Sequence, residues 1–243
     1  MREVFQQELQ DVQERLTEIA GLVESAITRA TEAFSESDVS LAEEVIADDA
    51  KIDAAASALD EVAIDILARQ APVARDLRVV VTALRVSSSL ERMGDMAEHI
   101  AQLARQRFPE KVVPKGLRGT FKEMGKHDVA MSQKLTRLLA TEDIALAAEI
   151  RDEDDAVDEL HASVFDFVLG EAWKGGPVDT VDATLASRYH ERFADHAVSI
   201  AKKVQYLATG DWAGNEDAVA VESIPEPVQP KEQPPVHPLE TSD

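Results

Sequence analysis

Hydrophobic residues recur at steps of three and four along most of this chain, which is the spacing of one face of an α-helix. A first seam of this kind comprises Phe5, Leu9, Val12, Leu16, Ile19, Val23 and Ala26. In a second segment, about residues 38–69, hydrophobic residues lie seven apart, at Val45, Ile52, Leu59 and Ile66. A third segment, about residues 75–106, carries a seam of Ala83, Val86, Leu90, Met93, Ala97, Ile100 and Ala104. Such seams are typical of helices that pack lengthwise against one another.

Proline and glycine divide this helical pattern. Pro72 ends the second segment. Three further breakers, Pro109, Pro114 and Gly116, predict a linker over residues 109–116. Beyond the linker the pattern resumes, and it predicts three more helices, at about residues 117–140, 142–172 and 178–208. The sequence therefore predicts an all-α fold of six helices.

The chain changes character after Gly210. Six of the ten prolines lie between Pro225 and Pro238, among acidic residues and few hydrophobic ones. Such a segment buries too little apolar surface to offset the entropy of ordering, so residues 211–243 are predicted to be an acidic, disordered tail. Its prolines favour extended conformations, which suit either a solubilising extension or a proline-rich ligand for another protein.

The chain contains an internal repeat. Residues 91–101 match residues 191–201 at six of eleven positions, an offset of one hundred residues. The second predicted helix of each half aligns at an offset of 105 residues, which brings both the hydrophobic seams and a pair of aspartates into register. We therefore expect two tandem, pseudo-symmetric three-helix bundles related by duplication, residues 1–108 and 117–210.

Each half carries two pairs of acidic residues spaced four apart, and each pair shares one face of a helix. The pairs are Asp49 with Asp53, Glu91 with Asp95, Asp154 with Asp158, and Glu191 with Asp195. Like charges at this spacing destabilise a helix by roughly 0.2–0.5 kcal/mol, so they favour an arginine, solvent or a cation nearby. Two pairs that meet across neighbouring helices would offer carboxylate oxygens to divalent or trivalent ions of iron, zinc, manganese or magnesium. The alternative is that these residues form the solvated flank of amphipathic helices.

Basic residues and histidines accompany the acidic pairs. Arg92 and Arg192 each follow the glutamate of a pair. A guanidinium there suits an anion or a partner protein, and it equally suits an ordinary salt bridge to a neighbouring helix. His99 and His196 lie beside the same motif, so each is either an additional metal ligand or a surface residue. Neither has a histidine at the equivalent position of the other repeat.

Charge and composition narrow the classes of partner and location. The 25 basic and 47 acidic residues give a formal net charge of −22, which opposes binding to nucleic acid and to anionic lipid. The chain has no cysteine, so a metal site would use oxygen or imidazole ligands. The first residues lack the apolar core of a signal peptide, and no later run reaches the roughly 20 apolar residues of a membrane span. We therefore expect a cytoplasmic protein without direct membrane insertion.

The repeated motif resembles that of the PhoU family. The segment Glu91-Arg92-Met93-Gly94-Asp95, followed by Ala97 and Ile100-Ala101, is similar to the Glu-Arg-Ile-Gly-Asp motif of that family. The segment Asp76-Leu77-Arg78 is similar to the family's Asp-Leu-Arg segment. The second copy, from Glu191 through Tyr206 to Gly210, resembles the family's closing helix. The resemblance covers nearly the whole chain before the tail.

The resemblance implies two symmetric three-helix bundles in which the acidic residues of the repeated motif hold metal clusters. It further implies a negative regulator of phosphate uptake and phosphate-starvation signalling. Such a regulator is a cytoplasmic adaptor between the ATPase subunit of the Pst phosphate transporter and a PhoR-type sensor kinase, and we expect it to form a homodimer. The chain departs from the family pattern at three positions, where it has His99, Ala194 and Ser199, and its second half lacks an Asp-Leu-Arg segment.

Two other functions remain as alternatives. A carboxylate-bridged di-iron oxidase also uses a helical bundle, but it requires Glu-x-x-His on two helices, and this chain offers only Asp158-Glu159-Leu160-His161. A helical scaffold without a ligand explains the seams and leaves the repeated acidic pairs unexplained. The sequence contains no glycine-rich phosphate loop and no nucleophile elbow, so we expect a protein that is not an enzyme.

Overall fold

The computed structural model describes residues 2–113 and 115–209. The predicted six-helix, all-α fold is confirmed, because the described part of the chain contains six long helices and one short 3-10 turn. They are α1 (Arg2–Glu36), α2 (Val39–Gln70), α3 (Ala74–Arg107), η1 (Lys115–Leu117), α4 (Arg118–Thr141), α5 (Ala145–Leu169) and α6 (Pro177–Thr209). The predicted tail, residues 211–243, lies outside the described residues.

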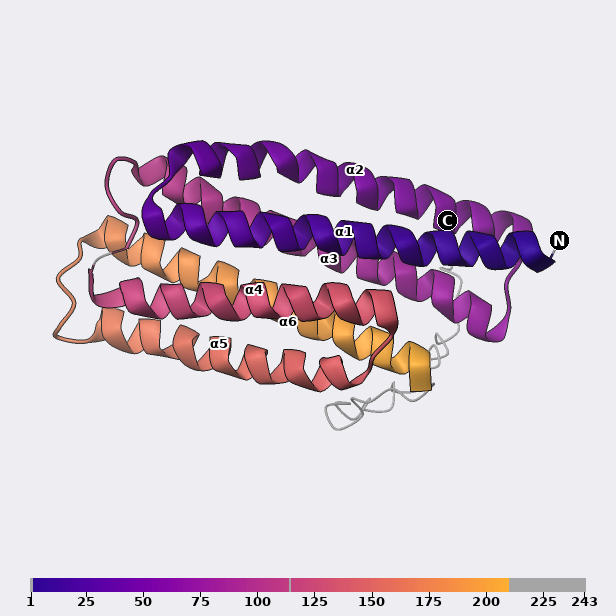
Figure 1. The fold of residues 1–243 in the computed structure, drawn as a ribbon. Helices are drawn as coiled ribbons and strands as arrows, with labels where there is room; N and C mark the ends of the chain where they lie inside the picture. The colour runs from indigo at the N-terminus through magenta and orange to yellow at the C-terminus, as the bar shows by residue number, and fades with distance from the viewer. Residues whose placement is uncertain (1, 114, 210–243) are drawn as a thin grey trace, which may run out of the picture. The chain divides into compact units, whose positions relative to one another are not determined.

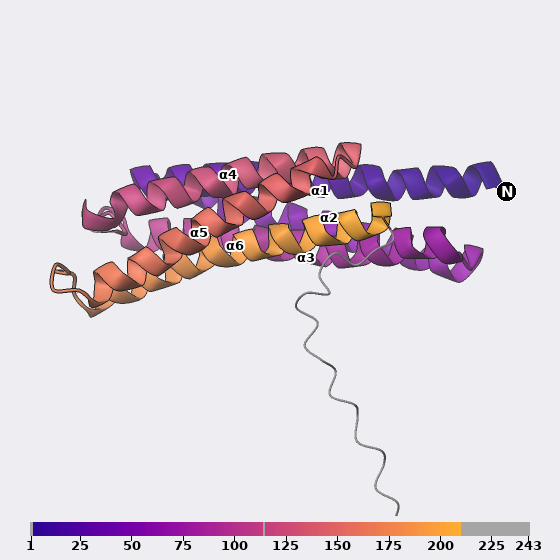
Figure 2. The same ribbon diagram turned by 90° about the horizontal axis from the view of Figure 1, so that it is seen from below.

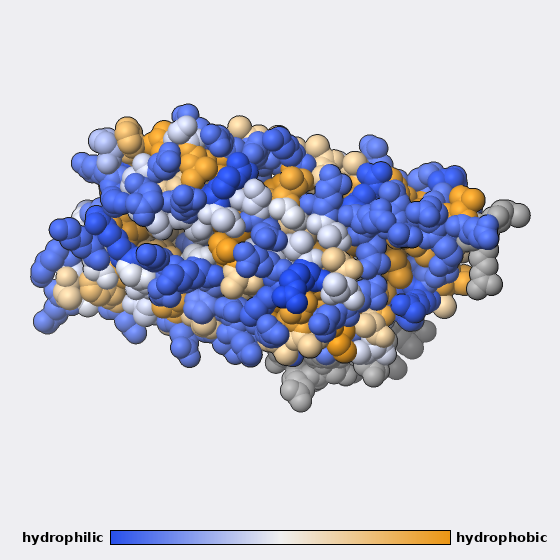
Figure 3. Space-filling view, viewed as in Figure 1, coloured by the Kyte–Doolittle hydropathy of each residue, from blue (hydrophilic) through white to orange (hydrophobic). Residues whose placement is uncertain are grey.

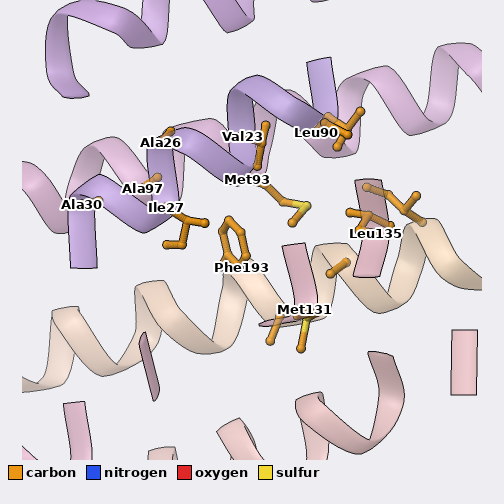
Figure 4. Packing of buried hydrophobic residues seen from close by; sticks show 14 of the residues in the cluster. Val23, Ala26, Ile27, Ala30, Leu90, Met93, Ala97, Met131, Leu135 and Phe193 are labelled. Atoms are coloured by element: carbon orange, nitrogen blue, oxygen red, sulfur yellow. The ribbon is translucent and has the colours of Figure 1, made fainter. Parts of the chain in front are cut away.

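Each half is an antiparallel three-helix unit, α1 to α3 and α4 to α6, and the two units lie lengthwise against each other (Figures 1 and 2). The contacts between them are made by α3 with α6 and by α1 with α4. One hydrophobic core runs through all six helices. Figure 4 shows its centre, where Phe193 of α6 lies among Ile27 of α1, Met93 of α3 and Met131 of α4.

The duplication is visible in the burial of individual side chains. The buried positions of α1 recur in α4 at an offset of 105 residues, so that Leu16 corresponds to Phe121 and Ile19 to Met124. Two positions break the pattern, because Val23 and Ile27 in the first half correspond to the buried polar residues Asp128 and Ser132 in the second. The two halves therefore share one packing plan, with two polar exceptions in the second.

The antiparallel register of α3 and α6 is fixed by contacts along their length. The imidazole of His99 stacks on the ring of Tyr189, with centroids 4.9 Å apart. Nearer the C-terminus of α3, Nη2 of Arg107 donates to Oδ1 of Asp182 at 2.8 Å. This register brings the two copies of the repeated motif to the same level, where Met93 of α3 lies beside Phe193 of α6 (Figure 4).

The first half is longer than the second. Helix α1 has 35 residues whereas α4 has 24, and α2 has 32 whereas α5 has 25. The N-terminal part of α1 and the adjoining ends of α2 and α3 consequently project past the second half (Figure 2). The segment Asp76-Leu77-Arg78 lies in the first turns of α3, within this projection.

The linker between the halves contributes two valines to the core, which its proline and glycine content did not predict. Val112 and Val113 are 2% and 4% exposed, and Leu117 at the end of η1 is 2% exposed.

Most of the surface of the molecule is polar, as Figure 3 shows for one face. None of the described helices is long and apolar enough to cross a membrane.

Candidate metal sites

The acidic pairs of the first half meet between α2 and α3. Asp49 of α2 is half-buried, and burial together with the negative charges of Asp53, Glu98, Asp95 and Glu91 raises its pKa to about 6. All four residues predicted for this site are therefore brought together. Glu98 joins them, although the repeat gave no sign of it because its equivalent is a valine, Val198. We call these five residues the first acidic cluster.

The acidic pairs of the second half meet in the same way between α5 and α6. Burial, followed by the charges of Asp158, Asp195, Asp155 and Glu191, raises the pKa of Asp154 to about 6. Burial and the neighbouring Asp195 also raise the pKa of Glu191. The four predicted residues, with the additional Asp155, form the second acidic cluster.

Gly94 lets α2 and α3 approach closely at the first cluster. A Cβ atom at this position would lie 3.0 Å from both Oδ1 of Asp49 and Cδ1 of Ile52. The absence of a side chain thus leaves room for the carboxyl of Asp49 between the helices. In the second half the equivalent residue is Ala194, which is buried, so that helix pair accommodates a methyl group.

The two predicted arginines differ in their contacts. Nη1 of Arg92 forms an ion pair with Oδ2 of Asp95 at 2.8 Å, within α3 and not with the neighbouring helix that the salt-bridge alternative named. In the second cluster the ion pair to Glu191 comes from Arg188, one turn earlier. Arg192 is exposed and makes no ion pair with another described residue. Sequence reasoning missed Arg188, which stands three residues before Glu191, because its equivalent in the first half is Ser88.

The histidines of the motif lie between the halves. The imidazole of His99 stacks on Tyr189, and its Nδ1 is buried without a hydrogen-bond partner among the described residues. Burial and then the charge of Arg192 lower the pKa of His196. Both side chains are partly buried.

A third histidine, His190, forms a buried pair that the sequence did not reveal. Its Nδ1 lies 2.6 Å from Oδ2 of Asp128, and the two side chains are 1% and 0% exposed. Burial raises the pKa of Asp128 despite the attraction of His190. The equivalent residues of the first half are Val23 and Leu90. The sequence therefore held one sign of this pair, because two polar residues in the second repeat replace two apolar residues in the first.

The donor chemistry of both acidic clusters fits a metal ion. Carboxylate oxygens are ligands for hard cations, and the pKa of about 6 at Asp49 and Asp154 reflects first their burial and then the negative charge of the carboxylates around them. Oε2 of Glu191 is also buried without a hydrogen-bond partner in the described structure. In the arrangement observed, however, no three acidic or histidine side chains of the described residues converge as a ready-made ligand set. A metal would therefore have to draw the carboxylates inward.

The Asp-x-x-His segment considered for a di-iron oxidase has another arrangement. Nδ1 of His161 lies 2.6 Å from the hydroxyl oxygen of Ser187, and its ring packs edge-on against Phe165. Burial and the charge of Arg188 lower the pKa of His161. This imidazole thus already has a polar partner on α6.

Comparison with known proteins gives a consistent result. The PhoU domain model matches twice, over residues 16–104 and 121–204. The chain is 42% identical over 210 residues to the phosphate-specific transport system accessory protein PhoU homolog 2 of Mycobacterium tuberculosis, which covers 86% of this chain and 99% of that protein. It is also 42% identical over 212 residues to PhoU homolog 1 of Mycobacterium leprae, covering 87% of this chain and 96% of that protein.

Two solved structures share the fold. The crystal structure of PhoU from Pseudomonas aeruginosa superimposes with a TM-score of 0.78 at 30% identity and covers 85% of this chain and 100% of the other. The phosphate transport system regulatory protein PhoU from Streptococcus pneumoniae has a TM-score of 0.75 at 25% identity, covering 86% and 98% of the two chains. The two matched domains correspond to the two three-helix units described above.

Proposed function

Since this chain belongs to the PhoU family, we propose that it is an accessory protein of a phosphate-specific transport system and a negative regulator of phosphate-starvation signalling. The observation that carries the first part is the 42% identity, over almost the full length of the relative, to a protein named as such an accessory. The regulatory part extends this by linking transport activity to gene expression.

In this proposal the protein acts in the cytoplasm as an adaptor between the ATPase subunit of a Pst-type transporter and a PhoR-type histidine kinase. Two similar three-helix units in one chain supply two related surfaces, so one molecule can contact two partners. The exposed Arg192 and the salt-bridged Arg92 lie at equivalent positions of the two units and differ in their freedom to meet an acidic partner.

We further propose that each acidic cluster holds metal ions. Asp49, Asp53, Glu91 and Asp95 would bind in the first half, and Asp154, Asp158, Glu191 and Asp195 in the second. A bound cation would offset the repulsion among these carboxylates and tie α2 to α3 and α5 to α6. Iron, zinc, manganese and magnesium all suit oxygen-rich sites, so the identity of the ion is a matter for elemental analysis.

The proposed homodimer has a candidate surface at the junction of α5 and α6. Five large hydrophobic side chains are exposed there: Phe165, Leu169, Val178, Val181 and Leu185. Leu169 alone is 84% exposed. Sedimentation of the wild-type protein and of a Leu169→Glu variant will test this surface, and a wild-type monomer at all concentrations would refute it.

A gene deletion tests the regulatory role directly. We expect the deletion strain to express phosphate-starvation genes in high phosphate and the wild-type gene to restore repression. Co-purification with the transporter ATPase and with the kinase tests the adaptor role separately. Normal repression in the deletion strain would contradict the regulator proposal, whereas restored repression without either interaction would contradict only the adaptor.

A further inference from the structure

A pocket lies beside the linker that connects the first half of the chain to the second. It has a volume of about 230 Å³ and is bounded by the end of α1, the linker and the first turns of α4. Its floor is apolar, with Phe34 and Phe121 buried and their rings 5.5 Å apart. Its rim carries three basic side chains, Lys111, Arg118 and Lys122, and one acidic one, Glu36. It contains no residue of either acidic cluster.

Two of the basic groups are held in place by backbone oxygens. Nζ of Lys111 donates to the carbonyl oxygen of Ser35 at 2.8 Å, and Nε of Arg118 donates to that of Val113 at 3.2 Å. Neither contact uses a carboxylate, so no paired anion offsets either positive charge. The terminal nitrogens of Arg118 make no hydrogen bond to another described residue, which leaves them available to a ligand.

Lys122 is the third basic group and has the fewest ties. Its Nζ makes neither a hydrogen bond nor an ion pair within the described structure. One turn later, by contrast, Lys126 pairs with Glu123 at 2.6 Å. Lys122 shares the absence of an ion pair with Lys111, the other lysine on the rim of the pocket, whose Nζ bonds only a backbone carbonyl. The charge of Lys122 is therefore directed to the pocket and to solvent.

The start of α4 adds to this positive character. Leu117, the residue before the helix, supplies no side-chain cap, so the backbone N–H groups of the first turn lack that partner. Arg118 and Lys122 stand on the first and second turns of the same helix. The positive end of the helix dipole and the three cations favour a negatively charged ligand.

We propose that this pocket binds a small phosphate-type oxyanion, held by Lys111, Arg118 and Lys122 beside the first turn of α4. The anion is either free inorganic phosphate or the phosphate group of a small organic molecule whose body lies on the floor formed by Phe34 and Phe121. The pocket is lined by the end of α1, the linker and the start of α4. A bound anion would therefore hold together segments from both halves.

Titration calorimetry on the full-length, chelator-treated protein tests the proposal, since removing metal prevents phosphate from binding through the acidic clusters. Inorganic phosphate and adenosine monophosphate serve as separate probes. We expect at least one to bind, with an affinity that falls as salt is raised. In the double variant Arg118→Gln with Lys122→Gln we expect a loss of about tenfold or more, as two charge-assisted hydrogen bonds are removed.

Lys126→Gln is the matched control, because it removes the same charge from the same helix one turn away. Binding should be unchanged in this variant. Lys122→Gln alone makes a second test if the double variant unfolds, since Lys122 has no hydrogen bond to lose. If inorganic phosphate binds, the free ion is a sufficient ligand. If only adenosine monophosphate binds, the ligand is the phosphate group of a small organic molecule. Failure of both probes to bind, or equal binding by wild type and the Lys122 variants, would overturn the proposal, whatever the outcome for the regulatory role.

Discussion

At the scale of single residues, the repeat identified the acidic clusters but not their basic partners. The predicted carboxylates gather because helices of a duplicated unit bring equivalent residues to equivalent places. The ion pairs do not follow the repeat: Arg92 pairs with Asp95, whereas Arg188 rather than Arg192 pairs in the second half. A long side chain can reach partners three and four residues away on its helix, and the sequence alone does not determine with which of them it pairs.

The raised pKa values of Asp49 and Asp154 lead to a prediction for the metal-free protein. Both values are about 6 in the folded state, above the ordinary 3.8, so the folded protein binds these protons more tightly than the unfolded chain. The two groups therefore destabilise the fold above about pH 6, and this cost is relieved as the pH falls from 6 towards 4. We expect Asp49→Asn with Asp154→Asn to raise the melting temperature at pH 7.5 and to leave it little changed near pH 4.

Thermal unfolding in the presence of a chelator, from pH 4 to pH 8, is the relevant measurement. If the double variant shows the same pH dependence as the wild type, these two aspartates are not the groups responsible.

The buried pair of Asp128 and His190 gives a second prediction. Replacing one partner leaves the other buried and unpaired, so Asp128→Val or His190→Leu alone should destabilise the fold by about 3–5 kcal/mol. The double variant recreates the apolar pair Val23 and Leu90 of the first half, and it should recover most of this loss. Urea unfolding of the four proteins completes a double-mutant cycle, and additive effects would show that the two side chains are not coupled.

At the scale of helices, the sequence predicted where helices run better than how they end. The expected segments agree with α2 to α6 within a few residues, because the hydrophobic seams are long and regular. Three helices end at a residue with positive φ that is not glycine. These residues are Ser37, Ala71 and Glu142, with φ angles of 62°, 42° and 53°. Non-glycine residues rarely take this conformation, which is why composition could not mark these ends.

The C-cap of α2 therefore offers a stabilising substitution. Ala71 has φ 42° and ψ 57°, the left-handed conformation in which glycine carries no Cβ penalty. We expect Ala71→Gly to stabilise the protein by about 1 kcal/mol. Ala68→Gly is the control, because this exposed residue lies inside the helix, where the same change should cost about 1 kcal/mol. Stability changes of the same sign in both variants would contradict the interpretation.

At the scale of the whole molecule, the duplication predicted the two three-helix units, and their mutual packing was not predictable. Seams of period three and four give each helix an apolar face. They do not say that α3 packs on α6 in an antiparallel register, because that depends on long-range contacts such as His99 with Tyr189. The burial of the linker residues Val112 and Val113 and the basic pocket beside them were not predicted, for the same reason.

The presence of two separate clusters makes a prediction about metal content. Replacing Asp49, Asp53, Glu91 and Asp95 by their amides should lower the bound metal by about half, since the second cluster keeps its carboxylates. The helical fold should survive, because like-charge repulsion is removed. A control with amides at four exposed positions, Glu18, Glu43, Glu44 and Glu61, should keep the wild-type metal content. Elemental analysis of untagged protein measures both, and equal metal content in the two variants would show that the first cluster is only a solvated face.

The core that runs through all six helices has a consequence for cooperativity. Phe193 belongs to the second half, yet it is completely buried at the contact with α1 and α3, so neither half can melt without exposing the other. We expect a single calorimetric transition, with equal van't Hoff and calorimetric enthalpies. A ligand that binds one half would then slow amide hydrogen exchange in the other half as well. Both halves unfold together, so binding to either one raises the free energy of unfolding for the whole domain.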